Sequence, residues 1–393
     1  MARYRYLVVG GGMTADAAVR GIRDHDTDGT IGLITAEAHA PYSRPPLSKG
    51  LWTGSSEEAI WRGTADLGVD VRLGRRAVSL DVDARTATDD TGDEHSFERI
   101  LLATGGVARR LPSAPDDVIA FRTLDDYRRL RALATPGAHV LVVGGGFIGS
   151  EIAAALTTKG CRVTMVFPED GIGARLFPAS LSAFVNDYYR ERGVEVHPGE
   201  LVKDVVSDAD GFRVVAEDGA SFTVDAVVAG LGIQPATELA ESAGLEVDDG
   251  IVVDEFGRAG GREDVYAAGD VARFPAPALG GNMRIEHEDH ANTHGRAVGA
   301  NMAGAGAPYD HLPFFYSDLF DLGYEAVGEV DSRLRTVEEW ADPNRKGVVA
   351  YVDESGLPRG FLLWDTWGKV DAARDLIRAA EPLAAEALRA LLD

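Results

Sequence analysis

Two stretches of this chain share one pattern: a short apolar run ends in closely spaced glycines and continues into a helix-favouring run. The clearer one lies mid-chain, where His139 to Val143 predicts a buried strand and Ile152 to Leu156 a helix. Between them stand the glycines of a GxGxxG fingerprint: Gly144, Gly146 and Gly149. Such glycines let the backbone turn and let a pyrophosphate reach the helix N-terminus, where N–H groups favour anions. Glu169 follows 20 residues after Gly149, where an acid that binds the adenosine ribose is expected.

The same pattern opens the chain. Arg5 to Val9 predicts a parallel core strand, Ala15 to Arg23 a helix, and Ile31 to Thr35 a second strand. The turn carries the small residues of a GxGxxA variant: Gly10, Gly12 and Ala15. Glu37 stands 22 residues after Ala15, in the place of the ribose acid. Two dinucleotide-binding units in one chain indicate two dinucleotides, and therefore electron transfer between them.

The remaining pattern alternates strands and helices, which favours an α/β fold. Hairpins are expected over Val69 to Leu80 and Ala84 to Glu94. One strand, Arg99 to Gly106, ends in Thr104-Gly105, and another, Ala226 to Pro235, carries Gly232 in a glycine turn. Further helices are expected over Arg122 to Leu133 and Ser180 to Arg192.

The last segment has a different character. It contains short aromatic-rich stretches, FFYSDLF, GVVAYV and GFLLW, and a helix from Lys369 that Pro382 interrupts. This composition predicts a separate α+β domain at the C-terminus.

Composition limits the possible partners. The net charge is −24, from 63 acidic and 39 basic residues, and a solvated acidic surface accounts for it. Such a surface disfavours nucleic acid, which needs a basic face, and would repel a strongly acidic ferredoxin. No run of 18 apolar residues occurs, so no membrane span is expected. The first strand begins almost at once, which leaves no room for a signal peptide and indicates a cytoplasmic protein.

The cysteine and histidine residues of the chain limit which redox groups and metal sites it can form. Cys161 is the one cysteine, so a redox dithiol within the chain is excluded and a buried packing role is expected. Arg284 to Arg296 gathers three histidines with acids and arginines, for which a solvated helix face is the simplest interpretation. Metal binding is disfavoured because His287 and His290 have no third ligand at a fixed offset, so no metal is expected.

Two further places offer groups for a cofactor. The loop Ala40 to Trp52 holds three prolines with Arg44 and Lys49, and a rigid loop with two cations suits contact with phosphate or with polar flavin atoms. A solvated surface loop is the alternative. Asp270 follows a predicted strand at a helix start, where its carboxylate could accept a hydrogen bond from a ligand hydroxyl.

These stretches together resemble a family. VVGGGMTADAAV, ATGG and AAGDVA resemble the FAD fingerprints of two-dinucleotide flavoprotein reductases, and VVGGGFIGSE resembles their NAD fingerprint. The cysteine-free loop PYSRPPLSKGLW is similar to the ferredoxin-reductase branch. Nearly the whole chain is similar to apoptosis-inducing factor and its bacterial relatives, through VFPEDGIGARLFP, RIEHEDHA, GRAVGANM, PFFYSDLFDLGYEAVGEVDS and GFLLWDTWGKVDAARDLI.

The resemblance implies an FAD domain split around an NAD domain, with a C-terminal domain that covers the flavin. The expected limits are 1–122 and 246–307 for the FAD domain, 123–245 for the NAD domain and 308–393 for the third. It implies FAD-side contacts from Gly10, Gly12, Ala15, Glu37, Arg44, Lys49, Thr104, Gly105, Asp270 and Tyr316, the last standing where the family often has tryptophan. It implies NAD-side contacts from Gly144, Gly146, Phe147, Gly149, Glu151, Glu169 and Gly232.

The resemblance also implies catalytic positions. Lys49 and Glu151 should pair beside the flavin, Phe147 should lie near the nicotinamide, and Glu286 and His287 should lie at the nicotinamide–flavin junction.

The expected activity is FAD-dependent NADH oxidation, in which NADH gives a hydride to the flavin and electrons pass to a second acceptor. That acceptor could be a ferredoxin, a quinone or oxygen. One alternative is a ferredoxin reductase beside an oxygenase. Another is a redox sensor with a long-lived reduced-flavin–NAD complex and an NADH-dependent homodimer. A scaffold that keeps FAD only structurally is disfavoured by the intact NAD fingerprint.

Overall fold

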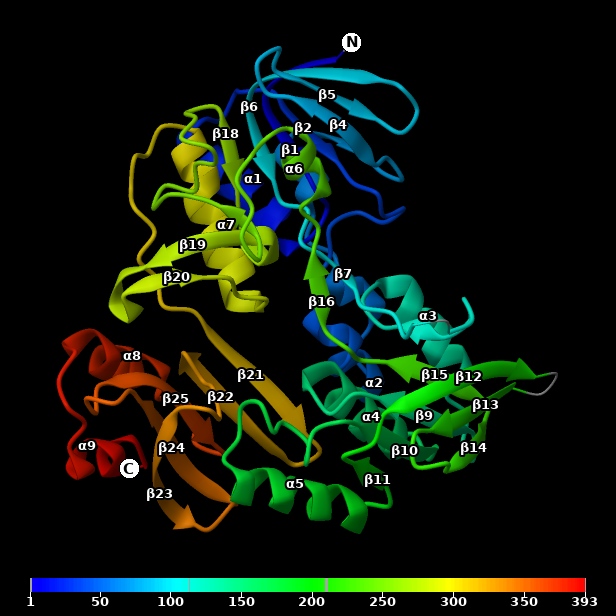
Figure 1. Cartoon of the computed structure of the whole chain (residues 1–393). Coiled ribbons are helices and arrows are strands. Elements are labelled where there is room, and N and C mark those ends of the chain that lie inside the picture. Colours follow the sequence, from blue (N-terminus) through cyan, green and yellow to red (C-terminus); the bar gives the residue numbers. More distant parts are fainter. Residues whose placement is uncertain (1, 113, 209–210, 393) are drawn as a thin grey trace. The chain divides into compact units, whose positions relative to one another are not determined.

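The computed structural model of the chain describes residues 2–112, 114–208 and 211–392 (Figure 1). The described residues form two compact units by their internal contacts. The first unit comprises residues 2–44, 56–107 and 234–313, and the second comprises 45–55, 108–233 and 314–392. The chain passes between them at five points, two of which lie in β7 (Gly106–Ala108) and β16 (Ile233–Pro235). These two strands pair as a two-stranded ribbon. The three sets of domain limits given above stay a prediction.

The first unit contains a mostly parallel sheet of the dinucleotide-binding kind. Its strands are β1 (Ala2–Val9), β2 (Ile31–Ile34), β3 (Val69–Arg72), β4 (Ala77–Asp81), β5 (Thr86–Asp89), β6 (Glu94–Leu102) and β18 (Val265–Ala267). Strands β3, β2, β1, β6 and β18 run parallel in this order, while β5 and β4 continue antiparallel from β6. The strand order reverses beside β1, which is where such sheets bind a nucleotide.

One predicted hairpin is wrong. Val69 to Leu80 does not fold back on itself, because Val69–Arg72 joins β2 as a parallel edge strand, with Val69 opposite Ile31. The antiparallel pairs lie later, between β4 and β5 and between β5 and β6. The side chains of β3 alternate between half-buried and exposed, as in a hairpin on a surface, so the local pattern could not separate the two.

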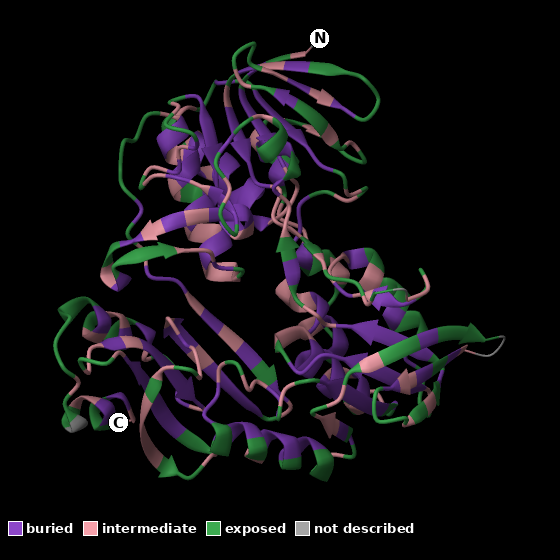
Figure 2. Cartoon of the chain, in the orientation of Figure 1, coloured by how far each residue is buried: buried purple, intermediate pink, exposed green. Residues whose placement is uncertain are grey.

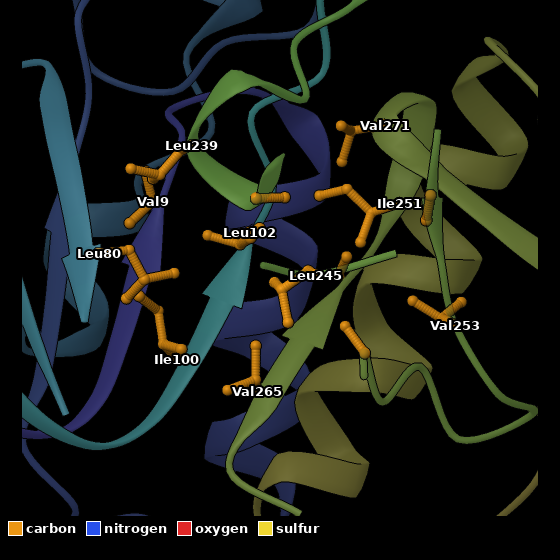
Figure 3. Packing of buried hydrophobic residues seen from close by; sticks show 14 of the residues in the cluster. Val9, Leu80, Ile100, Leu102, Leu239, Leu245, Ile251, Val253, Val265 and Val271 are labelled. Atoms are coloured by element: carbon orange, nitrogen blue, oxygen red, sulfur yellow. The ribbon is translucent and has the colours of Figure 1, made fainter. Parts of the chain in front are cut away.

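The core of the first unit joins residues far apart in sequence. Side chains from β1 and β6 pack with those of the segment around 239–271, which includes β18 (Figure 3). The helices of this unit are α1 (Met13–His25), α6 (Glu238–Ser242) and α7 (Glu288–Met302), with short 3-10 turns η2 (Glu57–Ile60), η3 (Thr64–Leu67), η4 (Gly269–Val271) and η5 (Pro277–Leu279). A small sheet of β17 (Ile251–Val252), β19 (Ala272–Ala276) and β20 (Gly281–Met283) completes it.

Helices α1 and α7 approach closely because glycines face the other helix. A Cβ on Gly21 would clash with the backbone of Arg296, and a Cβ on Gly295 or Gly299 would clash with the backbone of α1. Only glycine allows this spacing, which fixes α7 beside the helix that follows the first fingerprint.

The second unit repeats the parallel design. Its sheet contains β8 (Ile119–Ala120), β9 (His139–Val143), β10 (Arg162–Phe167), β11 (Glu195–Pro198) and β15 (Ala226–Ala229) in the order β11-β10-β9-β15-β8. Its helices are α3 (Leu124–Leu133), α4 (Phe147–Thr158) and α5 (Ala179–Glu191), with η1 (Pro45–Leu47) and α2 (Gly50–Thr53) from the proline-rich loop. A small antiparallel sheet contains β12 (Val202–Asp208), β13 (Gly211–Ala216) and β14 (Ser221–Val224). Strands β1 and β9, one from each unit, are buried over most of their length (Figure 2).

The predicted strand Ala226 to Pro235 is two strands. β15 ends at Ala229, and β16 begins at Ile233 after a turn in which Gly232 has φ +77°. Strand β15 belongs to the parallel sheet and β16 to the ribbon, so a continuous apolar run serves two different sheets.

The C-terminal part of the second unit is an antiparallel sheet with helices, as expected. Its strands are β21 (Phe314–Leu319), β22 (Leu322–Gly328), β23 (Arg335–Asp342), β24 (Lys346–Val352) and β25 (Pro358–Trp364), in the order β21-β22-β25-β24-β23. Helix α8 (Val370–Ala379) ends before Pro382, and α9 (Ala385–Leu392) follows. No helix in the described ranges has the length and apolar composition needed to cross a bilayer.

Candidate functional site

The first fingerprint has the geometry that a pyrophosphate requires. Gly10 adopts φ +128°, and a Cβ there would clash with the carbonyl of Ala103. Around Gly12 no atom lies within 4 Å of where a Cβ would be, so the backbone is open to a ligand. Gly12 caps α1 without a side-chain hydrogen bond, and Ala15 is fully buried. This end of α1 therefore fits an anionic group.

The second fingerprint repeats these features one by one. Gly144 adopts φ +116°, and a Cβ there would meet the carbonyl oxygen of Gly230. Gly146 again has open space, while a Cβ on Gly149 would clash with the backbone of Gly144. The three glycines are thus required for different purposes: Gly144 for the turn, Gly146 for the close approach of a ligand and Gly149 for packing. Both units fit a dinucleotide, and FAD, when bound, would supply the hydride-accepting ring that no side chain offers.

The carboxylate of Glu37, the predicted ribose-binding acid of the first unit, is held by two neighbouring side chains. Glu37 follows β2 and accepts a hydrogen bond of 2.7 Å from the hydroxyl of Tyr42. Arg44 forms an ion pair with the other oxygen of Glu37 and lies over the Tyr42 ring, 5.1 Å from its centroid. The loop therefore brings Arg44 to the predicted ribose acid.

Asp270 lies in η4, directly after β18. Gly269, at φ +74°, lies so close to Thr14 that a Cβ there would clash with its side chain. Asp270 is near enough to Arg44 and His287 for its charge to act on both. The first unit thus gathers Asp270, Arg44 and the start of α1, as an FAD site requires.

The residues predicted for the nicotinamide–flavin junction lie at the start of α7. His287 is the N-cap of this helix, and burial lowers its pKa to about 4, against the opposing charges of Asp270 and Asp289. The imidazole is therefore neutral at pH 7. Glu286 is paired with Arg284, with 2.6 Å between Oε1 and Nη1.

The expectation of a solvated helix face for Arg284 to Arg296 is wrong. His290 and His294 are 0% and 1% exposed and stack on one another with ring centroids 4.7 Å apart. Phe274 lies against His290 at 4.5 Å, and the N–H of Gly269 donates to Nδ1 of His294 at 3.3 Å. Phe274 and Tyr309 cover this face of α7, which the polar sequence does not suggest.

Lys49 and Glu151 meet in the second unit. They form an ion pair, with the side chain of Lys49 14% exposed and that of Glu151 6% exposed. Glu151 lies on α4, one turn after Phe147, and Lys49 follows η1. The proline-rich loop therefore carries Lys49 to the helix of the NAD fingerprint.

Two serines complete this pair, and sequence reasoning missed both. The hydroxyl of Ser48 donates to Oε2 of Glu151 and that of Ser317 donates to Oε1, each at 2.6 Å. Ser317 lies on β21, 166 residues from Glu151 in sequence, so no local pattern could reveal it. The adjacent Tyr316 places its ring 5.3 Å from the Lys49 ammonium.

Phe147 packs against the same strand. As the first residue of α4, it contacts Phe315 edge to face, with ring centroids 5.3 Å apart. The aromatic side chain predicted to lie near the nicotinamide is thus supported by the C-terminal sheet.

The remaining predicted glycine and threonine positions have structural partners. The hydroxyl of Thr104 donates to the carbonyl of Ala236 at 2.7 Å, and Gly105 adopts φ +63°. The carbonyl of Gly232 accepts a hydrogen bond from the N–H of Arg109 at 3.0 Å. Glu169 follows β10 and is paired with Arg175 at 2.7 Å.

Cys161 is buried, and burial raises the pKa of its thiol. Its Sγ donates a weak hydrogen bond to the carbonyl of Thr135 at 3.5 Å. Among residues 2–112, 114–208 and 211–392, no three or more His, Cys, Asp or Glu side chains are placed to hold a metal ion.

Two family profiles match successive parts of this chain. The sequence profile of the pyridine nucleotide-disulphide oxidoreductases matches residues 4–295, and that of the apoptosis-inducing factor, mitochondrion-associated, C-terminal domain matches 298–345.

Individual relatives agree. The chain is 35% identical to apoptosis-inducing factor 1 of Dictyostelium discoideum, over 95% of this chain and 78% of that protein. It is 34% identical to the ferredoxin–NAD(+) reductase component of the anthranilate 1,2-dioxygenase system of Burkholderia cepacia, over 86% and 85%. The putidaredoxin reductase–putidaredoxin complex contains a chain that matches with TM-score 0.91 and 26% identity, over 100% of this chain and 96% of that one.

The two fingerprints, the shared fold and these relatives establish the activity class, which is FAD-dependent NAD(P)H oxidation with FAD and NAD(H) as cofactors. This chain belongs to the pyridine nucleotide-disulphide oxidoreductase family, in its apoptosis-inducing-factor-like branch.

Proposed function

We propose that this chain oxidises NADH and acts as a redox sensor that keeps its reduced flavin in a long-lived complex with NAD. The similarity to apoptosis-inducing factor over 95% of the chain, including its C-terminal segment, supports this function over a simple reductase. The preference for NADH is proposed from Glu169, since a carboxylate accepts hydrogen bonds from a ribose 2′-hydroxyl and repels a 2′-phosphate.

The observation that carries the proposal is the packing of Phe147 on Phe315. This contact joins the first residue of the NAD-binding helix to β21 of the C-terminal sheet. An apolar wall beside the nicotinamide would exclude water and slow the access of oxygen. Bound NAD would also favour whichever arrangement of this sheet it contacts best, because a ligand shifts an equilibrium by its differential affinity.

The test is an anaerobic titration of the purified protein with NADH, followed by admission of air. We expect a broad long-wavelength absorbance band from reduced flavin stacked on oxidised nicotinamide, and we expect it to persist for minutes. His287→Ala should shorten its lifetime. His197→Ala is the matched control, since His197 lies half-buried on β11 and pairs with Glu195. Rapid reoxidation without such a band would contradict the sensor function.

An NADH-dependent homodimer is part of the same proposal. Sedimentation velocity before and after NADH addition tests it, and an unchanged sedimentation coefficient at a concentration where the band forms would contradict it.

The second candidate is a ferredoxin reductase. It is favoured by the whole-chain match to putidaredoxin reductase and by the dioxygenase reductase relative. The net charge of −24 opposes a strongly acidic ferredoxin. Fast transfer from NADH through an added ferredoxin to cytochrome c, with rapid reoxidation in air, would favour this alternative.

A further inference from the structure

The carboxylate of Glu151 receives three donors inside the second unit. Oε1 accepts from Ser317 at 2.6 Å and is paired with Lys49, while Oε2 accepts from Ser48 at 2.6 Å. Ser317 is 0% and Ser48 6% exposed. Both oxygens are therefore engaged, and the plane of the carboxylate is fixed.

The donors come from rigid segments. Ser48 and Lys49 follow two prolines, and the indole N–H of Trp52 donates to the carbonyl of Leu47 at 2.7 Å. The hydroxyl of Tyr127 on α3 donates a hydrogen bond to the carbonyl of Leu51 at 3.2 Å. Such support keeps the loop on the NAD-binding sheet.

The third donor is equally fixed. Ser317 lies in the middle of β21, opposite Tyr324 of β22. The C-terminal sheet therefore determines where this hydroxyl lies, and it points to a residue of the NAD-binding helix.

No other cation pairs with Glu151 within the described ranges. Two buried tyrosines, Tyr189 on α5 and Tyr324 on β22, lie near enough for the charge of Glu151 to act on them. Burial, and then the charge of Glu151, raises the pKa of each well above its ordinary value. Both phenols stay protonated and uncharged. Lys49 is therefore the charged side chain whose position depends on where this carboxylate lies.

We propose that Ser317, together with Ser48, is a positioning residue that acts through Glu151 to hold Lys49 at one point over Tyr316. Without these hydroxyls the carboxylate could rotate, and the ammonium would lose its fixed place beside the NAD-binding helix. The C-terminal sheet would thereby set the position of the positive charge that the oxidoreductase presents to its cofactors. The link to the flavin rests on the contact between Lys49 and FAD that the family resemblance implies, and thus on the proposed function.

The first experiment measures how firmly Lys49 is held. The FAD-loaded protein is treated with limiting acetic anhydride, and the acetylation rate of each lysine is followed by mass spectrometry. The chain contains four other lysines that serve as internal standards: Lys159, Lys203, Lys346 and Lys369. We expect Ser317→Ala to raise the rate at Lys49 several-fold and to leave the other four unchanged.

Two further variants separate positioning from general disruption. Ser48→Ala removes the same kind of donor from another segment and should raise the Lys49 rate as well, which keeps the test valid if Ser317→Ala fails to fold. Ser355→Ala is the matched control, because Ser355 donates to Asp353 at 2.6 Å in an exposed turn of the same C-terminal sheet. It should leave the Lys49 rate unchanged.

The second readout is the midpoint potential of bound FAD, measured anaerobically with a reference dye. Both serine variants should shift it in the same direction as Glu151→Gln and by a smaller amount. Unchanged acetylation of Lys49 in the folded serine variants would overturn the proposal. Faster acetylation with an unchanged potential would overturn its link to the flavin. Neither result depends on the NADH-induced band, which tests the sensor function separately.

Discussion

The guanidinium of Arg175 is held by the carboxylate of Glu169: Nη2 lies 2.7 Å and Nε 2.9 Å from the same oxygen, Oε1. The side chain of Arg175 is 85% exposed, so this pair contributes little to stability, at most about 1 kcal/mol. Its effect is on recognition instead. The arginine that could bind a 2′-phosphate is occupied by the acid that is expected to bind the ribose.

Replacing Glu169 with Ala should weaken the preference for NADH. The ribose hydroxyl loses its acceptor and Arg175 is released to pair with a 2′-phosphate, so kcat/KM should fall with NADH and rise with NADPH. We expect the ratio of the two to change by about tenfold or more, ~1.4 kcal/mol in transition-state binding. Steady-state kinetics with both coenzymes measures it.

The double variant Glu169→Ala with Arg175→Ala is the control for this effect. It should lose the gain with NADPH, because the released guanidinium is gone. If the parent protein used NADPH as well as NADH, Arg175 would have to leave Glu169 and bind the 2′-phosphate, and the expected preference would be wrong.

Cys161→Ser should leave flavin reduction by NADH nearly unchanged. The thiol is buried, has no second cysteine to pair with, and donates only weakly to the Thr135 carbonyl. Stopped-flow measurement of the visible absorbance of oxidised flavin provides the comparison. If a folded Cys161→Ser protein were no longer reduced, the exclusion of thiol chemistry would be wrong.

Sequence reasoning succeeded where structure is local. Strand β9 has the predicted limits, His139–Val143, because a short apolar run bounded by glycines is fixed by its own residues. The open backbone at Gly12 and Gly146 follows from the same fingerprints. The pairing of Lys49 with Glu151 is non-local, and it could be anticipated only by resemblance to a family.

The failures concern contacts that no local pattern encodes. Ser317 is an ordinary polar residue of an alternating strand until the fold brings it to Glu151. His290 and His294 look like solvated helix residues, yet Phe274 and Tyr309, distant in sequence, cover their rings. Both errors arise because tertiary packing, not residue type, decided burial.

Removing the charge of Glu151 tests the ion pair itself. In Glu151→Gln the ammonium of Lys49 stays in a largely buried place without its counter-charge, and such losses typically cost about 3–5 kcal/mol of unfolding free energy. The unpaired positive charge should also favour anionic reduced flavin, so the midpoint potential should rise. Denaturant unfolding and dye titration measure the two effects.

The double variant Lys49→Met with Glu151→Gln should recover part of the lost stability, since no buried charge is then left alone. Single-variant values equal to those of the parent protein would mean that the pair is solvated in solution.

The buried histidines of α7 should make the protein acid-sensitive. Burial lowers the pKa of His294 to about 3, and burial with the neighbouring histidines lowers that of His290 well below its ordinary value. Both groups then bind protons more readily in the unfolded chain, whose histidines titrate near 6.5. Their contribution is therefore complete above about pH 6.5 and is lost as the pH falls toward the folded-state values, by up to ~1.4 kcal/mol per pH unit for each histidine.

The buried carboxylates affect the free energy of unfolding in a lower pH range than the histidines, so the two contributions can be measured separately. Desolvation acts to raise the pKa of Asp16 and Asp264, but their arginine partners lower it overall, so the stability that these carboxylates contribute is lost only below about pH 4. Between pH 4.5 and 6.5 the slope of unfolding free energy should thus belong mainly to histidines. His290→Phe, which keeps a ring between Phe274 and His294, should reduce this slope. The same substitution at half-buried His197 should not, and urea unfolding of the FAD-loaded proteins across this range distinguishes the two. Equal slopes in the parent protein and His290→Phe would mean that His290 becomes protonated without unfolding the chain.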